Sequence, residues 1–174
     1  LAFVGSLVWY KGVDVLVRAF ARLDPARATL AIHGAFDPRH DAYHAELERL
    51  GAGRVAFHGQ FRHAELAEIH GAIDVLVVPS VWFENSPITI HEAFQFQTPV
   101  VTSDIGGMAE LVQDGRSGLL FRTGDVGDLA RVLGRLIDEP GLLQALAHFP
   151  RVKSVAENAR EMEFRYRSLA SFKA

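Results

Sequence analysis

Short apolar segments alternate with helical patterns along most of the chain. Continuous apolar runs bounded by turn residues are typical of strands that are buried on both faces. The six runs expected to form strands are 1–4, 28–33, 54–58, 74–78, 99–102 and 119–121. Because helical patterns separate these runs, the pattern predicts parallel strands joined by helical crossovers.

The segments between the runs carry the spacing of amphipathic helices. Apolar residues on one helical face between the first two runs are Val13, Leu16, Val17 and Phe20. Further helices are expected over 41–50, 64–71, 86–97 and 107–112. Asp125 is expected to cap a helix with an apolar stripe at Leu129, Val132, Leu133, Leu136 and Ile137. A last helix is expected over 154–172, after the break at Pro150.

This order of elements predicts an α/β fold: a doubly wound parallel sheet of about six strands with helices on both faces. The length of 174 residues suits one domain, over 1–174, with one well-buried core. In such folds ligands bind outside the carboxyl ends of the strands. The residues that follow each strand are therefore the expected ligand contacts.

The segment 79–92 carries two carboxylates around an expected helix start. The fourth strand stops at Pro79, and Ser86 is expected to cap the next helix, with Pro87 at its first position. The free N–H groups and partial positive charge of a helix start favour an anion. Glu84 lies just outside this start and Glu92 inside the helix. A nucleotide sugar, with phosphates and hydroxyls, suits this arrangement.

The segment 5–12 links the first strand to the first helix and places Gly5 and Ser6 near Lys11. A glycine allows backbone to approach a phosphate closely, and a lysine adds a mobile cation. The spacing is neither that of a Walker loop nor that of Gly-x-Gly-x-x-Gly, so a plain strand-to-helix turn remains an alternative. Phe61 follows the third strand, so three separate loops converge on one edge of the sheet.

Several other patterns point away from common enzyme classes. The segment 91–95 has glutamine where a zinc-protease helix has its second histidine. His40 and His44 have helical i, i+4 spacing, and we expect a solvated face there. His33 and His58 each end a strand and either line the site or fill space. The pair Gly106 and Gly107 fits either a ligand-facing turn or a plain one. Neither Asp-x-Asp nor the hydrolase elbow Gly-x-Ser-x-Gly occurs.

Composition narrows the location and the partners. The chain has no cysteine and no apolar run near the roughly 18 residues that span a bilayer, so a cytoplasmic location is expected. The net charge of -3 divides unevenly. Residues 151–174 carry six basic against three acidic side chains. Without a basic and aromatic platform this excess predicts a solvated helix face, and no nucleic acid partner.

These residues together resemble a known family. The matching segments lie in order over about 1–140: 5–7, 11–16, 57–59, 72–75, 79–80, Glu84-x7-Glu92, 98–101, 106–112 and 114–120. They resemble the C-terminal, donor-binding domain of the retaining GT-B glycosyltransferases of the "glycosyl transferases group 1" family. That family transfers sugar from a nucleoside diphosphate, usually without a metal. The resemblance implies a UDP, GDP or ADP sugar as donor and no metal cofactor.

The resemblance also implies roles for single residues. Lys11 contacts the donor diphosphate and Glu84 the donor sugar, and these two are the candidate catalytic residues. Glu92 binds the ribose hydroxyls, and Phe61 lies against the base. The remaining candidate donor-binding residues are Gly5, Ser6, Asn85, Ser86, Pro87 and Ile88.

One position departs from the family pattern, since many members have arginine where this chain has Ser6. The loss of a bidentate cation favours, as an alternative, a non-catalytic nucleotide-binding or interaction domain of the same fold. A further alternative is an unrelated doubly wound enzyme such as a sugar epimerase.

The resemblance implies a protein longer than this chain. The chain begins directly in a strand and matches only the donor half, so the N-terminal acceptor domain is expected as a missing partner. The helix 154–172 would pack toward that domain. Membrane contact is expected only if the missing half supplies it. The chain alone should bind nucleotide weakly and be inactive.

Overall fold

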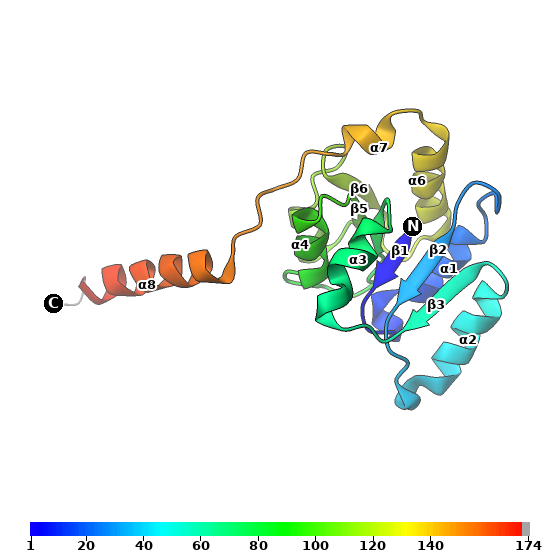
Figure 1. Cartoon of the computed structure of the whole chain (residues 1–174), viewed down its shortest axis with the longest axis horizontal. Coiled ribbons are helices and arrows are strands. Elements are labelled where there is room, and N and C mark those ends of the chain that lie inside the picture. Colours follow the sequence, from blue (N-terminus) through cyan, green and yellow to red (C-terminus); the bar gives the residue numbers. More distant parts are fainter. Residues whose placement is uncertain (172–174) are drawn as a thin grey trace.

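The computed structural model describes residues 1–171 and contains one six-stranded parallel sheet with helices on both faces (Figure 1). The strand order is β3-β2-β1-β4-β5-β6, which confirms the doubly wound fold. The strands are β1 (Ala2–Val4), β2 (Leu30–His33), β3 (Val55–Gly59), β4 (Leu76–Val78), β5 (Val100–Ser103) and β6 (Gly118–Phe121). All six expected strands form, and no strand end differs from the expected one by more than two residues.

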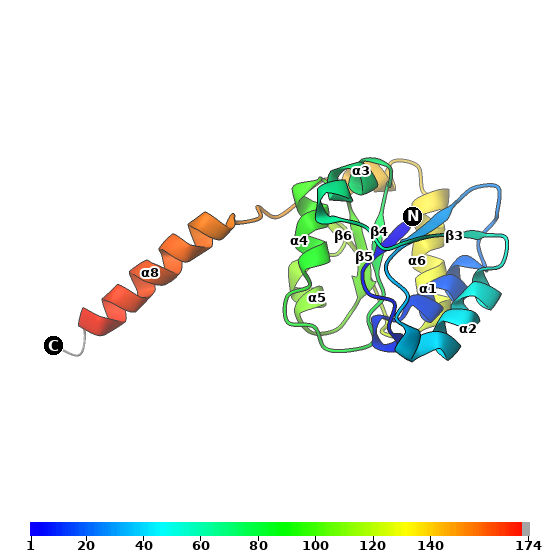
Figure 2. The ribbon, with the colours of Figure 1, turned by 60° about the horizontal axis from the view of Figure 1, so that its bottom comes forward.

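Helices cover the two faces of the sheet in two separate groups (Figure 2). One group packs in the core cluster formed with α1 (Val13–Phe20), α2 (Asp41–Gly51) and α6 (Val126–Asp138). The other packs in the cluster formed with α3 (Leu66–Gly71), α4 (Ile88–Gln95) and α5 (Gly106–Leu111). Alternation along β4 explains the two clusters, because Val77 faces the first and Leu76 and Val78 face the second.

Three predicted details are corrected by the structure. The helix expected from Ser86 begins at Ile88, with Pro87 at the N-cap. The helix expected over 64–71 consists of a 3-10 turn, η3 (His63–Glu65), followed by α3. Sequence periodicity also missed three short helices, η1 (Trp9–Lys11), η2 (Pro38–His40) and α7 (Leu142–Ala145), because they are too short to show a period.

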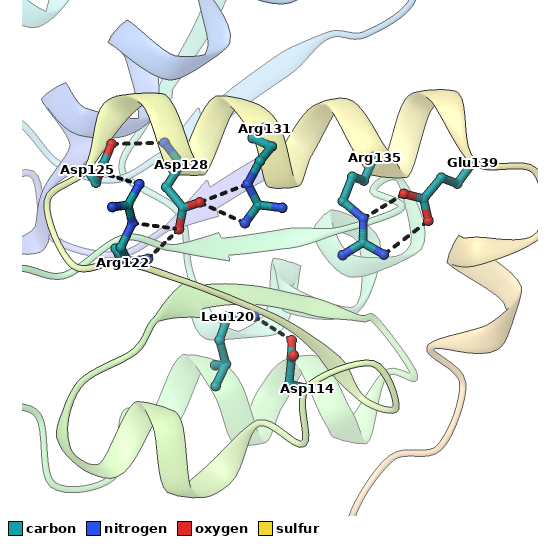
Figure 3. A network of polar contacts seen from close by, with 8 residues as sticks. All are labelled: Asp114, Leu120, Arg122, Asp125, Asp128, Arg131, Arg135 and Glu139. Carbon is teal, nitrogen blue, oxygen red and sulfur yellow. Dashed lines mark hydrogen bonds and ion pairs between the residues drawn. The ribbon is translucent and has the colours of Figure 1, made fainter.

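A polar network fastens the start of α6 to the end of β6 (Figure 3). Asp125 caps the helix as expected, accepting a hydrogen bond of 2.9 Å from the Asp128 N–H. The buried Asp128 carboxylate accepts from the Arg122 N–H at 2.8 Å and from the Arg131 guanidinium at 2.7 Å. These donors, the Arg122 N–H first, hold the pKa of Asp128 below its usual value. The carboxylate is therefore charged at neutral pH, and both of its oxygens accept hydrogen bonds.

We call residues 1–146, which end at the buried Leu146, the body. We call residues 147–171 the C-terminal arm. Phe149 and Val152 still pack against the second core cluster. Helix α8 (Val155–Ser171) then projects away from the sheet (Figures 1 and 2). Phe172, the end of the expected last helix, lies outside the described residues.

The side chains of α8 are exposed or half-exposed wherever the structure describes them. Exposed apolar side chains of the helix are Val155, Met162, Phe164, Tyr166 and Leu169. Ion pairs within the arm are Arg151–Glu157, Lys153–Glu161, Arg165–Glu161 and Arg167–Glu163. Among the helices of residues 1–171, none is both long and apolar enough to cross a bilayer.

Candidate functional site

The centre of the candidate site is an ion pair between two loops that are distant in sequence. The Lys11 ammonium lies 2.6 Å from the Glu84 carboxylate, and the side chains are 27% and 18% exposed. Lys11 ends the turn after β1, and Glu84 lies in the loop after β4. These strands are neighbours where the strand order reverses, which is where doubly wound folds bind their ligands.

The loop that carries Lys11 is fastened directly to the segment that follows β4. The Tyr10 carbonyl accepts a bond of 2.9 Å from the Val81 N–H and another of 2.9 Å from the Ser80 hydroxyl. Gly12 has φ +66, and a Cβ there would lie 2.1 Å from the Pro79 carbonyl oxygen. Only glycine therefore allows the two loops to approach this closely.

The loop that carries Glu84 is fastened on its other side by the paired glycines at the start of α5. The Gly107 N–H donates to the Glu84 carbonyl at 2.8 Å. A Cβ on Gly107 would lie 1.8 Å from the Asn85 carbonyl oxygen. The sequence left open what these glycines do. The structure shows that they let α5 abut the Glu84 loop.

A second close approach connects the ends of β1, β2 and β3. The Gly5 N–H donates to the His33 carbonyl at 2.9 Å, and the Gly34 N–H donates to the Gly59 carbonyl at 2.8 Å. A Cβ on Gly34 would lie 2.0 Å from the Gly5 carbonyl oxygen. Ser6, which follows Gly5, is exposed.

His33 and His58 lie at the same edge and stack on each other. Their rings are nearly parallel, with centroids 4.5 Å apart. Burial first, and then His58, lower the pKa of His33. The sequence left open whether these histidines line the site or fill space. In the structure His58 is exposed at the edge of the sheet, whereas His33 is half-buried.

The start of α4 differs from the expected cap. The Ser86 hydroxyl shares a hydrogen bond of 2.7 Å with His91 Nε2, and no side chain caps the helix. Ser86 is thus engaged with the first turn of the helix through a histidine one residue before Glu92. Pro87 is buried, whereas Asn85, Ser86 and Ile88 are exposed.

Glu92 lies beside a hollow of about 840 Å³. Burial raises the pKa of Glu92, and the nearby His63 opposes that rise. The lining residues from the body are His63, Ser86, Ile88, His91, Glu92 and Gln95, and those from the arm lie within 151–158. Lys11 and Glu84 do not line this hollow. The candidate donor-binding residues are therefore divided between the hollow beside α4 and the ion pair in the loop before that helix.

The structure also places Phe61 and His44, two residues singled out from the sequence. Phe61 is half-buried and packs against the second core cluster. His44 corrects the expected solvated face, because it is buried and its Nε2 lies 3.0 Å from the Leu7 carbonyl oxygen. It thereby supports the loop that carries Lys11. Residues 1–171 contain no group of three or more His, Asp or Glu placed to hold a metal ion.

Exposed aromatic side chains occur in the same two loops as the ion pair, and no role was predicted for them from the sequence. Trp9, Tyr10, Trp82 and Phe83 are 56%, 37%, 60% and 72% exposed, and they are the neighbours of Lys11 and Glu84 in sequence. The sequence shows that these aromatic residues are close to Lys11 and Glu84 along the chain. Only the structure shows that their side chains are exposed.

The geometry agrees with a comparison of the sequence with known families. The model of the family described as "Glycosyl transferases group 1" matches residues 1–139. The chain belongs to this family. The expected resemblance over about 1–140 is therefore confirmed.

Relatives with known names and structures support the same family. The D-inositol 3-phosphate glycosyltransferase of Corynebacterium aurimucosum is 37% identical over 147 residues, or 80% of this chain and 35% of that protein. Sucrose-phosphate synthase from Thermosynechococcus elongatus superposes with a TM-score of 0.85 at 28% identity, covering 98% of this chain and 45% of that one.

HepE from Anabaena, solved in complex with UDP and glucose, gives a TM-score of 0.81 at 26% identity over 95% of this chain and 47% of that one. The fold is thus the Rossmann-like unit of GT-B glycosyltransferases. The chain spans less than half the length of each of these proteins.

Proposed function

We propose that this chain is the donor-binding domain of a retaining glycosyltransferase, which moves a sugar from a nucleoside diphosphate sugar to an acceptor. The observation that carries the proposal is the Lys11–Glu84 pair of 2.6 Å at the switch point of a family member's sheet. A cation for phosphate and a carboxylate for sugar hydroxyls lie side by side there. That HepE was solved with UDP and glucose supports the same ligand class.

In this proposal Lys11 stabilises the negative charge that grows on the leaving nucleoside diphosphate. A preorganised donor of this kind contributes about 3–4 kcal/mol to catalysis. Glu84 holds the donor sugar, so that the two residues orient the bond that breaks. No metal is needed for this role, because the lysine supplies the positive charge.

The remaining donor contacts follow the edge of the sheet. Glu92 binds the ribose hydroxyls from the hollow beside α4, where its carboxylate is half-buried. Ser86 and Ile88 line the same hollow and contact sugar and phosphate with Asn85 and Pro87. Gly5 and Ser6 meet the diphosphate, and Phe61 lies against the base.

The rest of the protein completes the reaction. An N-terminal domain binds the acceptor, and the exposed apolar side chains of α8 pack toward it. We therefore expect the chain alone to bind nucleotide without transferring sugar. Membrane contact, if it occurs, comes from that other domain.

Thermal unfolding with UDP, GDP and ADP tests the proposal. At least one nucleotide should raise the melting temperature of the wild type, and Lys11→Ala and Glu92→Ala should lose that rise. Glu48→Ala, on the exposed face of α2, is the matched control and should keep it. If no nucleotide raises the wild-type melting temperature, the donor-site proposal is wrong.

The non-catalytic alternative has its own test. The observation that favours it is the exposed Ser6, at the position where the family resemblance implies an arginine in many members. Transfer by the longer protein from the nucleotide sugar that binds would exclude it. Binding without transfer by that protein would instead support a nucleotide-binding domain that has lost the reaction.

A further inference from the structure

The positive charge that the Lys11 loop offers to a phosphate is already neutralised inside the protein. Residues 5–12 contain one cation, Lys11, and no carboxylate. Glu84 supplies the opposite charge at 2.6 Å. Together the loop and Glu84 therefore carry no net charge toward an incoming diphosphate.

The backbones on both sides of this ion pair are held in place, so the two side chains start from fixed positions. Bonds of 2.9 Å from Val81 and 2.8 Å from Gly107 anchor the loops of Lys11 and Glu84, respectively. Both side chains are mostly shielded from water. Pairs that are shielded in this way interact more strongly than fully exposed ones, whose contribution is small.

The pair responds differently to the two halves of a donor. A diphosphate that approaches Lys11 also approaches the Glu84 carboxylate, and like charges repel at this range. A sugar brings neutral hydroxyl groups, which donate hydrogen bonds to the carboxylate. A bound sugar therefore occupies Glu84 and leaves the Lys11 ammonium available for phosphate.

We propose that Glu84 makes the site prefer a nucleotide sugar to a free nucleoside diphosphate, by competing for Lys11 whenever no sugar hydroxyl engages its carboxylate. This inference rests on the proposed function and extends it. After transfer the sugar departs, the carboxylate returns to Lys11, and the nucleoside diphosphate is released. A contact that assists sugar binding thus also assists release of the product.

Calorimetric titration separates the two halves of the donor. UDP, GDP and ADP are titrated first, and the tightest binder is then compared with its glucose or mannose conjugate. Glu84→Gln should bind the free diphosphate on the order of tenfold more tightly than wild type. Its affinity for the nucleotide sugar should not increase. Inorganic pyrophosphate, which has neither sugar nor base, should show the same gain.

A double-mutant cycle tests whether the gain acts through Lys11. In a Lys11→Ala background Glu84→Gln should give no gain, because there is no cation to release. Asp104→Asn is the matched control, since it removes an exposed carboxylate after β5 and changes the net charge equally. It should alter diphosphate affinity by less than about twofold.

The outcomes separate this inference from the proposed function. If Lys11→Ala weakens diphosphate binding but Glu84→Gln does not strengthen it, the inference is wrong and the donor site stands. If no nucleotide binds the wild type, both are wrong. If Glu84→Gln unfolds at a lower temperature than the titration requires, Glu84→Ala replaces it. That variant removes the same charge and must show the same gain in affinity for the free diphosphate.

Discussion

The body, residues 1–146, and the C-terminal arm, residues 147–171, use the same residue types to opposite effect. In the body, apolar side chains are buried in two clusters, and charged groups such as Asp128 fasten elements together. In α8, Phe164 and Leu169 are 72% and 66% exposed, and Glu161 pairs with Lys153 and Arg165, which belong to the arm itself. The body is stabilised by contacts among its own side chains, whereas the apolar side chains of α8 in the arm are left uncovered.

The largest expected effect is in the body, at Gly107. Gly107→Ala places a Cβ 1.8 Å from the Asn85 carbonyl oxygen, so the Glu84 loop must move. We expect a loss of about 3 kcal/mol or more in unfolding free energy and loss of nucleotide binding. Urea unfolding and titration of the nucleotide measure the two. Unchanged binding would show that the position of this loop is not needed.

A second prediction concerns Asp128 and pH. Asp128→Asn should lower the unfolding free energy by about 1–3 kcal/mol, because charged hydrogen bonds to Arg122 and Arg131 are lost. The folded-state pKa of Asp128 is depressed, so its contribution is present above the unfolded pKa and is lost as pH falls through the folded value. Urea unfolding between pH 7 and pH 3 should therefore show the wild type and the variant converging. A constant difference would contradict this.

A third prediction strengthens the body. Gly134 lies within α6 with no atom near the position of a Cβ. Gly134→Ala should raise the unfolding free energy by roughly 0.5–1 kcal/mol, because alanine loses less conformational entropy in a helix. Gly53→Ala is the contrast, since that site is equally open but has φ +71 and should be destabilised. Thermal unfolding of both variants compares them directly.

The smallest effect is expected in the arm. Ending the chain after Ser154 removes α8, which buries no described side chain. The unfolding free energy of the body should change by no more than about 0.5 kcal/mol. Ending it after His148 should cost more, because Phe149 packs against Phe94 at a ring distance of 6.0 Å. A large loss from the first truncation would contradict the division into body and arm.

Removing the arm also tests what its apolar face is for. If the chain is part of the longer glycosyltransferase proposed above, the truncation after Ser154 should weaken sugar transfer by that protein more than it weakens nucleotide binding by this chain. That result would distinguish a surface that packs on another domain from one that serves the donor site.

Much of the fold is readable from local pattern. The apolar runs predicted all six strands, and the spacing of Leu129, Val132 and Leu133 predicted α6 with Asp125 as its cap. These features depend on neighbours within a few residues, which is why periodicity and capping residues reveal them. Cap chemistry failed at Ser86, because its hydroxyl bonds to His91 instead of the helix backbone.

The sequence by itself determined the family, the six strands, the longer helices and the residues with suitable chemistry, including Lys11, Glu84 and Glu92. Only the tertiary structure decided that Lys11 and Glu84 pair across 73 positions of the chain. It also decided that Gly12 and Gly107 permit the loops to meet, and that His44 is buried. The physical reason is that such contacts depend on strand order and on close backbone packing, which no local pattern encodes.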